Sequence, residues 1–87
     1  MRESDIENYL VDEVKRLGGE CRKVRWIGRN GAPDRYIMLP GHCIWVELKA
    51  PGVAPKPHQL REHKRMRNLG QRVEVVDSFE RVDEVLR

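Results

Sequence analysis

The chain has 87 residues, of which 36% are charged and 6% aromatic, and its formal net charge is +3. This length suits one domain, expected over residues 1–87, with a small core built mainly from Val, Leu and Ile. No apolar run is long enough to span a membrane and no signal peptide is visible, so an intracellular, cytoplasmic location is expected. Cys21 and Cys43 are isolated and lack the spacing of a zinc site, which indicates ordinary core thiols.

Residues 4–17 are expected to form the first helix, because apolar side chains recur at helical spacing until a Gly-Gly pair ends the pattern. Ser4 and Glu7 fit a capping box, in which the Glu7 carboxylate reaches back to the Ser4 amide. Glu3 extends the apolar stripe toward the sheet, so an acid at this position could reach a site there. The alternative for Glu3 is a frayed terminus without a role.

The stretch 30–49 is expected to form a β-hairpin. An Asn-Gly turn leads into an apolar strand at 35–39, and a Pro-Gly turn separates this strand from a second one at 43–48. Residues 20–27 predict a preceding strand, followed by a basic loop at 28–31. The glycines of that loop would let the backbone approach a phosphate, although a plain turn explains them equally well.

Three ionisable side chains of this hairpin are expected to converge. Glu47 and Lys49 share one strand face, and the short turn returns Asp34 to the far end of the second strand. Two close carboxylates repel unless a positive charge neutralises them, and a hard cation such as Mg²⁺ supplies that charge. Such a cation activates a bound water and stabilises a phosphoryl oxygen. The alternative is an exposed strand edge with a Glu47–Lys49 ion pair, against which the apolar flanking residues argue.

The PD at residues 33–34 and the ELK at 47–49 resemble the two half-motifs of the PD-(D/E)XK nuclease superfamily. The wider pattern is similar to the VRR-NUC branch: GAPDR at 31–35, VELKAPG at 46–52, and a downstream Gln59. The resemblance covers nearly the whole chain and implies an α/β fold, a restriction-endonuclease-like αβββαβ(α) core with a mixed central sheet. It also implies a metal-dependent DNA endonuclease with Mg²⁺ as cofactor, for which Mn²⁺ can substitute.

The same resemblance implies roles for individual side chains. Two carboxylates and a backbone carbonyl would bind one or two metal ions, and the lysine would position and activate the water. An acid on the first helix and a glutamine on a later helix would support that water or the substrate. The metal ligands implied are Asp34, Glu47 and the carbonyl of Leu48. The other catalytic residues implied are Lys49, Gln59 and either Glu3 or Glu7.

Beyond the hairpin, a proline-rich loop at 50–57 leads into a helix expected at 58–69. The two histidines of this helix diverge around it, so they are not expected to share a metal. Residues 71–77 predict a fourth strand, and Ser78 is expected to cap a last helix. The element order indicates a mixed sheet, in which an antiparallel hairpin is joined to a parallel strand by a helical crossover.

Basic side chains concentrate in two places. One group leads into the expected site, which favours phosphate contact, whereas on the helix at 58–69 a solvated face with ion pairs is an equal alternative. Trp26 could stack on a base, although packing in the core or in a dimer is favoured. The residues expected to contact DNA are Arg25, Arg29, Asn30, Arg35 and Lys56.

The expected activity is structure-specific cleavage of DNA, because so small a chain offers little surface for reading base edges. Stand-alone members of the family resemble homodimeric Holliday-junction resolvases. This implies branched DNA and a second copy of the chain as partners, no membrane partner, and a bacterial or phage-like host. The alternatives are a flap- or nick-directed nuclease, a non-catalytic DNA-binding module, and a restriction-like or toxin nuclease, for which the chain offers no recognition domain.

Overall fold

The computed structural model describes all 87 residues of the chain. The order of elements is the predicted one: a helix, three strands, a helix, a strand and a helix. None of the helices has both the length and the apolar character needed to cross a membrane. The elements are α1 (Glu3–Arg16), β1 (Glu20–Lys23), β2 (Arg35–Leu39), β3 (His42–Leu48), α2 (Pro57–Asn68), β4 (Val73–Val76) and α3 (Phe79–Leu86).

The strands form one mixed sheet in the order β1-β2-β3-β4. The first three strands are antiparallel to their neighbours, whereas β4 runs parallel to β3. Parallel strands need a crossover connection, and α2 provides it between β3 and β4. The mixed sheet with a helical crossover is thereby confirmed, and β3 lies inside the sheet with a partner strand on each side.

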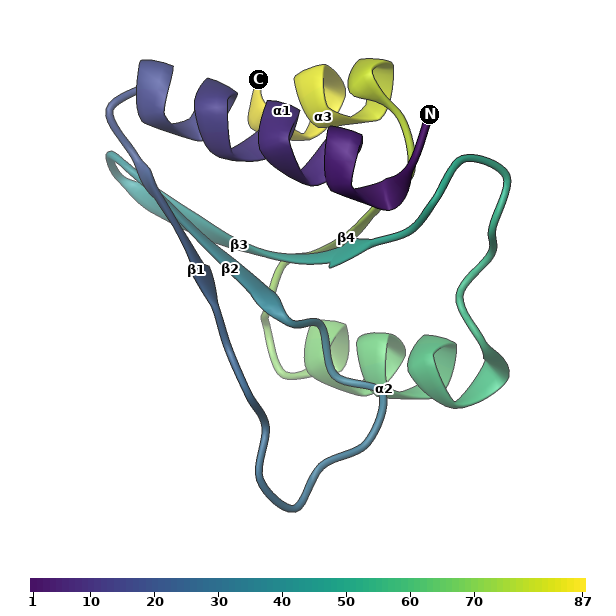
Figure 1. The fold of residues 1–87 in the computed structure, drawn as a ribbon. Coiled ribbons are helices and arrows are strands. Elements are labelled where there is room, and N and C mark those ends of the chain that lie inside the picture. Colours follow the sequence, from purple (N-terminus) through teal and green to yellow (C-terminus); the bar gives the residue numbers. More distant parts are fainter.

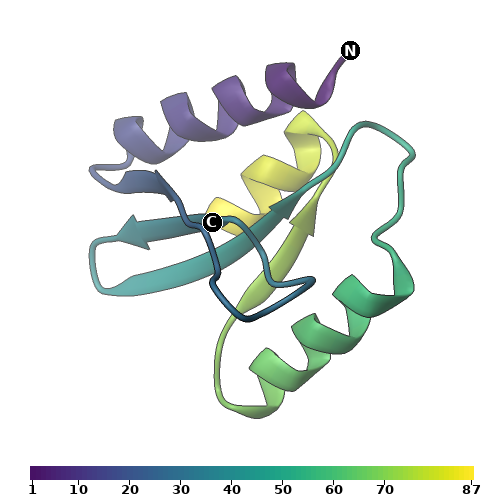
Figure 2. The same ribbon diagram turned by 60° about the horizontal axis from the view of Figure 1, so that its bottom comes forward.

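Helices cover both faces of this sheet. α1 and α3 lie side by side on one face, and α2 lies on the opposite face (Figure 1 and Figure 2). The core lies under α1 and α3, where apolar stripes of both helices meet the inward side chains of the strands. Its buried members are Ile6, Leu10, Val14, Ile37, Ile44, Val46, Leu48, Val76, Val82, Val85 and Leu86.

The start of α1, the end of β3 and the start of α2 lie on one side of the molecule. In Figure 1 the N-terminus of α1 lies on the same side as the end of β3. The loop of residues 49–56 leaves β3 there and runs to the start of α2. The end of β3 therefore lies on the same side of the molecule as the beginnings of α1 and α2, which carry the positive ends of the helix dipoles.

The cap of α1 differs from the predicted one. The helix begins at Glu3, and the backbone N–H of Arg2 donates to the Asp5 carboxylate at 2.7 Å. Because a capping residue has to precede the first helical turn, Ser4 is inside the helix and cannot serve as the N-cap. The predicted box between Ser4 and Glu7 is therefore wrong, and the Glu7 carboxylate is free for tertiary contacts.

β1 is shorter than the predicted strand, which was expected to continue to residue 27. The Val24 N–H still donates to the Asp34 carbonyl oxygen at 2.9 Å, but β2 begins only at Arg35. Beyond Val24 the backbone has no strand to pair with, so residues 24–34 form a loop. This loop carries Arg25, Arg29 and Asn30, three of the five residues that were assigned to DNA.

Two predictions for single residues had different outcomes. The Ser78 cap is confirmed, because its hydroxyl oxygen accepts from the Arg81 N–H at 3.0 Å. The prediction of a core thiol is wrong for Cys43, whose side chain is exposed. Cys43 alternates with the buried Ile44 along β3, so it faces away from the core under α1 and α3.

Candidate active site

The strand register brings Asp34 and Glu47 to the same end of the sheet. Arg35 pairs with Val46, so the residue before Arg35 lies beside the residue after Val46. Glu47 also pairs with Val75 of β4, and only 7% of its surface is exposed. The alternative of an exposed edge strand with a Glu47–Lys49 ion pair does not hold, since β3 is internal and its Glu47 is buried.

The loop before Asp34 is anchored from two directions. Gly31 has φ +82°, and a Cβ atom there would lie 2.8 Å from the carbonyl oxygen of His58, at the start of α2. The Trp26 indole N–H donates to the carbonyl oxygen of the buried Pro33 at 2.8 Å. The glycine permits the close approach and the tryptophan fixes the proline, so Asp34 enters β2 from a defined position.

The buried Glu47 carboxyl has a strongly raised pKa of about 7. Burial is the main cause, and the negative charges of Asp34 and Glu3 add to it, whereas the positive charges of Lys49 and Arg35 act in the opposite direction. Glu3 lies on α1, Asp34 and Arg35 lie at the start of β2, and Glu47 and Lys49 lie at the end of β3. The charges of Glu3, Asp34 and Lys49 therefore all act on Glu47.

Arg35 holds two carboxylates beside the site. Its guanidinium forms ion pairs with Glu7 of α1 and, at 2.9 Å, with Asp34. Its side chain is only 8% exposed, so the prediction that Arg35 contacts DNA is not supported. A buried guanidinium needs local anionic partners, and the two carboxylates occupy its donors. Of the two candidate acids of α1, Glu7 is thus held by Arg35, whereas Glu3 remains available beside Glu47.

His63 is a site residue that the sequence did not reveal. It lies on α2 and is fully buried, and its Nε2 atom is 3.4 Å from the Glu47 Oε1 atom. Neither ring nitrogen nor that carboxylate oxygen makes a hydrogen bond. From the sequence, His63 was only one of two histidines that diverge around the helix and were not expected to share a metal. Its position one helical turn after Gln59 was the available signal, because both side chains then share a face of α2.

Gln59 and Lys56 form the start of α2 next to the Gly31 loop. The Gln59 side-chain oxygen accepts from the Lys56 backbone N–H at 2.9 Å, which caps the helix. A Cβ atom on Gly31 would lie 3.1 Å from the Gln59 Cα atom, so this turn abuts the loop that leads to Asp34. Leu48 lies between Glu47 and Lys49 with a buried side chain, so only its backbone carbonyl could serve the site.

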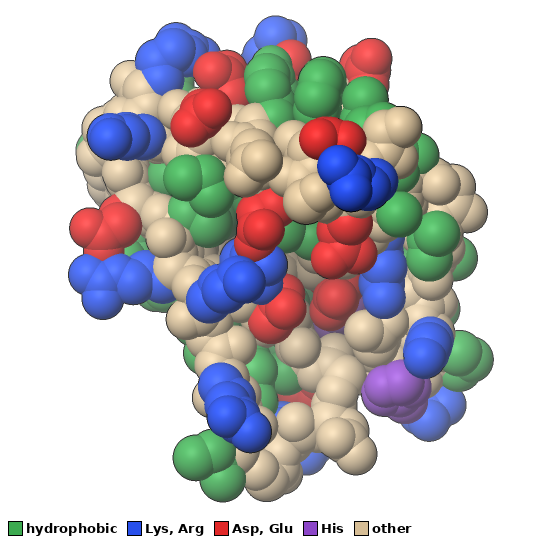
Figure 3. All heavy atoms as spheres, viewed as in Figure 1, with side chains coloured by type: hydrophobic (Ala, Val, Ile, Leu, Met, Phe, Trp, Pro, Cys, Tyr) green, Lys and Arg blue, Asp and Glu red, His purple; other side chains and the backbone are tan.

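Most of the residues assigned to DNA lie on the loop around this site. Arg25 and Asp34 both line a hollow of about 260 Å³, together with Lys23, Val24 and Arg35. Arg29 is partly exposed and lies 3.7 Å from Glu62 of α2, while Asn30 is exposed. Figure 3 shows acidic side chains gathered between α1 and α2 with basic side chains beside them.

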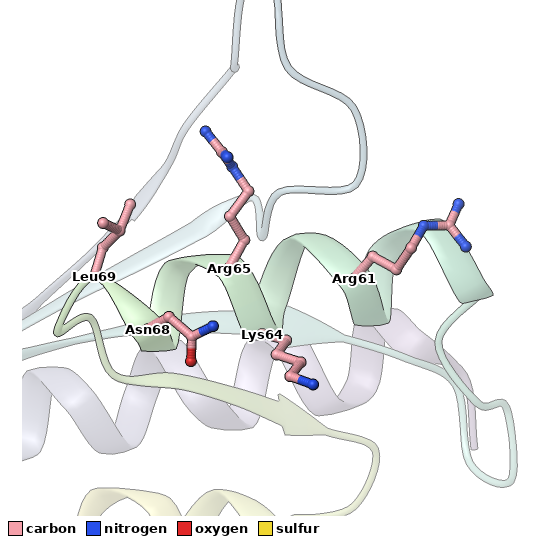
Figure 4. A pocket seen from close by; sticks show the side chains of 5 residues that line it. All are labelled: Arg61, Lys64, Arg65, Asn68 and Leu69. Carbon is pink, nitrogen blue, oxygen red and sulfur yellow. The ribbon is translucent and has the colours of Figure 1, made fainter.

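A second basic surface lies on the outer side of α2. A hollow of about 330 Å³ lies there, and its lining contains no carboxylate. Figure 4 shows the side chains that line it. Arg65 of this surface lies 3.7 Å from Glu62. Without acidic or histidine side chains, this hollow offers no ligands for a divalent cation. The lining residues are Arg61, Lys64, Arg65, Asn68 and Leu69.

The Asp34–Glu47 site fits a hard divalent cation. The Glu47 carboxyl is buried beside Asp34, and a neighbouring positive charge would lower its raised pKa and so favour the charged form. No group of three or more His, Cys, Asp or Glu side chains could hold an ion by itself. Two carboxylates with a backbone carbonyl and waters suit Mg²⁺, which usually keeps several of its waters in protein sites.

Known proteins are similar to this chain in sequence and in fold. A protein described as "Putative nuclease p44", from Acyrthosiphon pisum secondary endosymbiont phage 1, is 52% identical over 79 residues, covering 90% of this chain and 85% of that protein. A solved structure described as "VRR_NUC domain" is similar with a TM-score of 0.87 and 43% identity, covering 97% of this chain and 92% of that one. No protein-family model matches the chain. Both matches and the convergence of the GAPDR and ELK segments show that the chain belongs to the VRR-NUC family of nucleases.

Proposed function

We propose that this protein is a Mg²⁺-dependent DNA endonuclease that hydrolyses phosphodiester bonds in branched DNA. The observation that carries the proposal is the buried Glu47 carboxyl, which lies beside Asp34 and has a raised pKa. A carboxyl pair of this kind costs folding free energy, so its presence is best explained by binding of a cation. The likeness to a protein described as a nuclease supports the same conclusion.

The proposed roles follow from the positions of the side chains. Asp34 and Glu47 hold the cation, with the Leu48 carbonyl as a further ligand, and Mn²⁺ can replace Mg²⁺. When bound, the cation would act as a Lewis acid and would lower the pKa of a water molecule that it coordinates. The Lys49 ammonium stabilises the negative charge that develops on the phosphate, since its charge already acts on Glu47. Glu3 and Gln59 orient the attacking water from the starts of α1 and α2.

The proposed substrate is a four-way DNA junction, which a homodimer would cleave on two symmetry-related strands. The small size of the chain supports recognition of DNA structure rather than of base sequence. Arg25, Asn30 and Lys56 are exposed around the site and would contact phosphates. Arg29 would join them after separating from Glu62. The second candidate is a flap- or nick-directed nuclease, because the hollow beside Asp34 would accept the same phosphodiester in either substrate.

The test is cleavage of a labelled four-way junction, a flap and a nicked duplex, each with Mg²⁺ and with EDTA. We expect paired, symmetric cuts of the junction by the wild type, which require Mg²⁺ and are lost in Glu47→Ala. Cutting of flaps or nicked duplex alone would retain the nuclease and reject the junction. Tight binding without cutting of any substrate would reject catalysis and leave a DNA-binding module.

Lys49→Ala separates catalysis from binding in the same assay. We expect cleavage to fall on the order of 10²–10³-fold, because the ammonium acts on charge that develops in the transition state. Junction affinity should change little, since other basic residues supply most phosphate contacts. Circular dichroism and thermal unfolding serve as the control for folding. Loss of folding in Lys49→Ala would instead indicate a structural ion pair.

A further inference from the structure

His63 is the most unusual polar group in the molecule outside the carboxylate site. Its side chain is fully buried on the inner face of α2, and neither Nδ1 nor Nε2 has a hydrogen-bond partner. Buried polar side chains in native proteins are nearly always hydrogen-bonded, and an unpaired one costs about 1–3 kcal/mol. A leucine or methionine would fill the same space without that cost, so packing alone does not explain a histidine here.

The polar atom facing His63 belongs to the proposed metal site. Its Nε2 atom lies 3.4 Å from Glu47 Oε1, the buried carboxylate oxygen that also lacks a hydrogen bond. These two unpaired groups are within the distance at which a small side-chain rotation forms a hydrogen bond. An imidazole ring carries at least one N–H that it can donate.

We propose that His63 is a positioning residue of the metal site, which donates its Nε2–H to Glu47 Oε1 and holds the carboxylate for the cation. The hydrogen bond occupies the inner oxygen of Glu47 and leaves the other oxygen for the ion. Because α2 carries His63, the crossover helix fixes the ligand on β3. This inference rests on the proposed function, since the carboxylate must bind a cation for its orientation to matter.

The geometry distinguishes His63 from a metal ligand. His63 lies behind Glu47 within the protein, and it is fully buried, whereas the Asp34 side chain is 56% exposed. Groups that hydrogen-bond a metal ligand in this way orient it, and their loss typically weakens metal binding about 10–100-fold. A residue that only filled space would change the stability of the fold and leave metal affinity unaltered.

The experiment measures Mn²⁺ affinity by calorimetry on the full chain, without DNA. We compare the wild type, His63→Gln, His63→Leu, Glu47→Gln and the double variant Glu47→Gln/His63→Leu, with Met66→Leu as a control for repacking of α2. We expect His63→Leu to bind Mn²⁺ at least tenfold more weakly. His63→Gln retains an N–H donor and should bind within a fewfold of the wild type. In the Glu47→Gln background, loss of His63 should weaken binding no further.

The outcomes separate this inference from the proposed function. Wild-type affinity in a folded His63→Leu variant, or an equal loss in the Glu47→Gln background, would overturn the positioning role while the metal site stands. A similar loss in Met66→Leu would show that repacking of α2 is the cause and would also overturn it. Absence of Mn²⁺ binding by the wild type would overturn the metal site and this role together.

A second measurement needs no substitution and so does not depend on folding of a variant. The ¹⁵N resonances of the His63 ring in the wild type, with saturating Mg²⁺ at pH 8, report which nitrogen carries the proton. We expect the proton on Nε2. A proton on Nδ1 would direct a lone pair at Glu47 Oε1 and would overturn the proposal.

Discussion

At the scale of single residues, the Glu47 carboxyl of the proposed metal site lowers the stability of the metal-free fold, because its pKa is raised. A carboxyl in the unfolded chain has its ordinary pKa of 4.5, whereas in the folded protein the Glu47 pKa is about 7. Between these values the folded state binds a proton that the unfolded state lacks. The contribution of Glu47 to stability therefore falls as the pH rises from 4.5 to 7 and stays constant above that. Without a metal ion, the loss above pH 7 is about 3 kcal/mol.

Glu47→Gln tests this cost directly. The amide is neutral at every pH, so we expect the metal-free variant to be more stable than the wild type at pH 8, by up to about 3 kcal/mol. The difference should disappear near pH 4, where the wild-type carboxyl is protonated in both states. Urea unfolding at the two pH values measures it. A difference in stability that does not change with pH would show that the Glu47 carboxyl is not perturbed in this way.

At the scale of elements, the loop at 24–34 and the start of α2 form one unit. Gly31 allows the loop to approach the His58 carbonyl, and the Arg29–Glu62 pair adds a second link between loop and helix. The same loop delivers Asp34 to the sheet, and the same helix carries His63 behind Glu47. Displacement of the α2 start would therefore disturb both carboxylates at once.

Gly31→Ala should be more harmful than a matched change in the same loop. Gly31 and Gly28 both have positive φ, at +82° and +77°, so alanine at either position costs about 1–2 kcal/mol of backbone strain. Only at Gly31 does the new Cβ meet backbone, at 2.8 Å from the His58 oxygen, whereas nothing lies within 4 Å at Gly28. We expect Gly31→Ala alone to weaken Mn²⁺ binding as well as stability. Equal effects of the two variants on metal affinity would contradict the role of this contact.

At the scale of the whole molecule, charge is distributed so that acids occupy the end of the sheet and bases surround them. Arg25 and Lys56 are both exposed, and under the proposed function a nucleic acid bound at this face would contact them. Binding that neutralises phosphates releases counterions, so each lost contact reduces the dependence of affinity on salt by about 0.9 in the logarithmic slope.

The double variant Arg25→Gln/Lys56→Gln tests this arrangement. We expect the slope of the logarithm of junction affinity against the logarithm of salt concentration to decrease by roughly 1.8. Fluorescence anisotropy with Ca²⁺ in place of Mg²⁺ measures binding without cleavage. Lys15→Gln/Arg87→Gln removes the same charge from α1 and the C-terminus and is the control. Equal slopes for the two double variants would mean that the DNA does not follow the Arg25–Lys56 face.

The sequence by itself determined the order of elements, the hairpin with Asp34 and Glu47 at one end, and the family resemblance. These features depend on local spacing, since turns, strand alternation and motif residues lie close together in the chain. Only the tertiary structure decided which partner each charged side chain has. Arg35 turned inward to Glu7, and His63 came to lie behind Glu47, because packing of α1 and α2 on opposite faces of the sheet joins residues far apart in sequence. Burial then set the protonation of Glu47, which no local pattern of residues specifies.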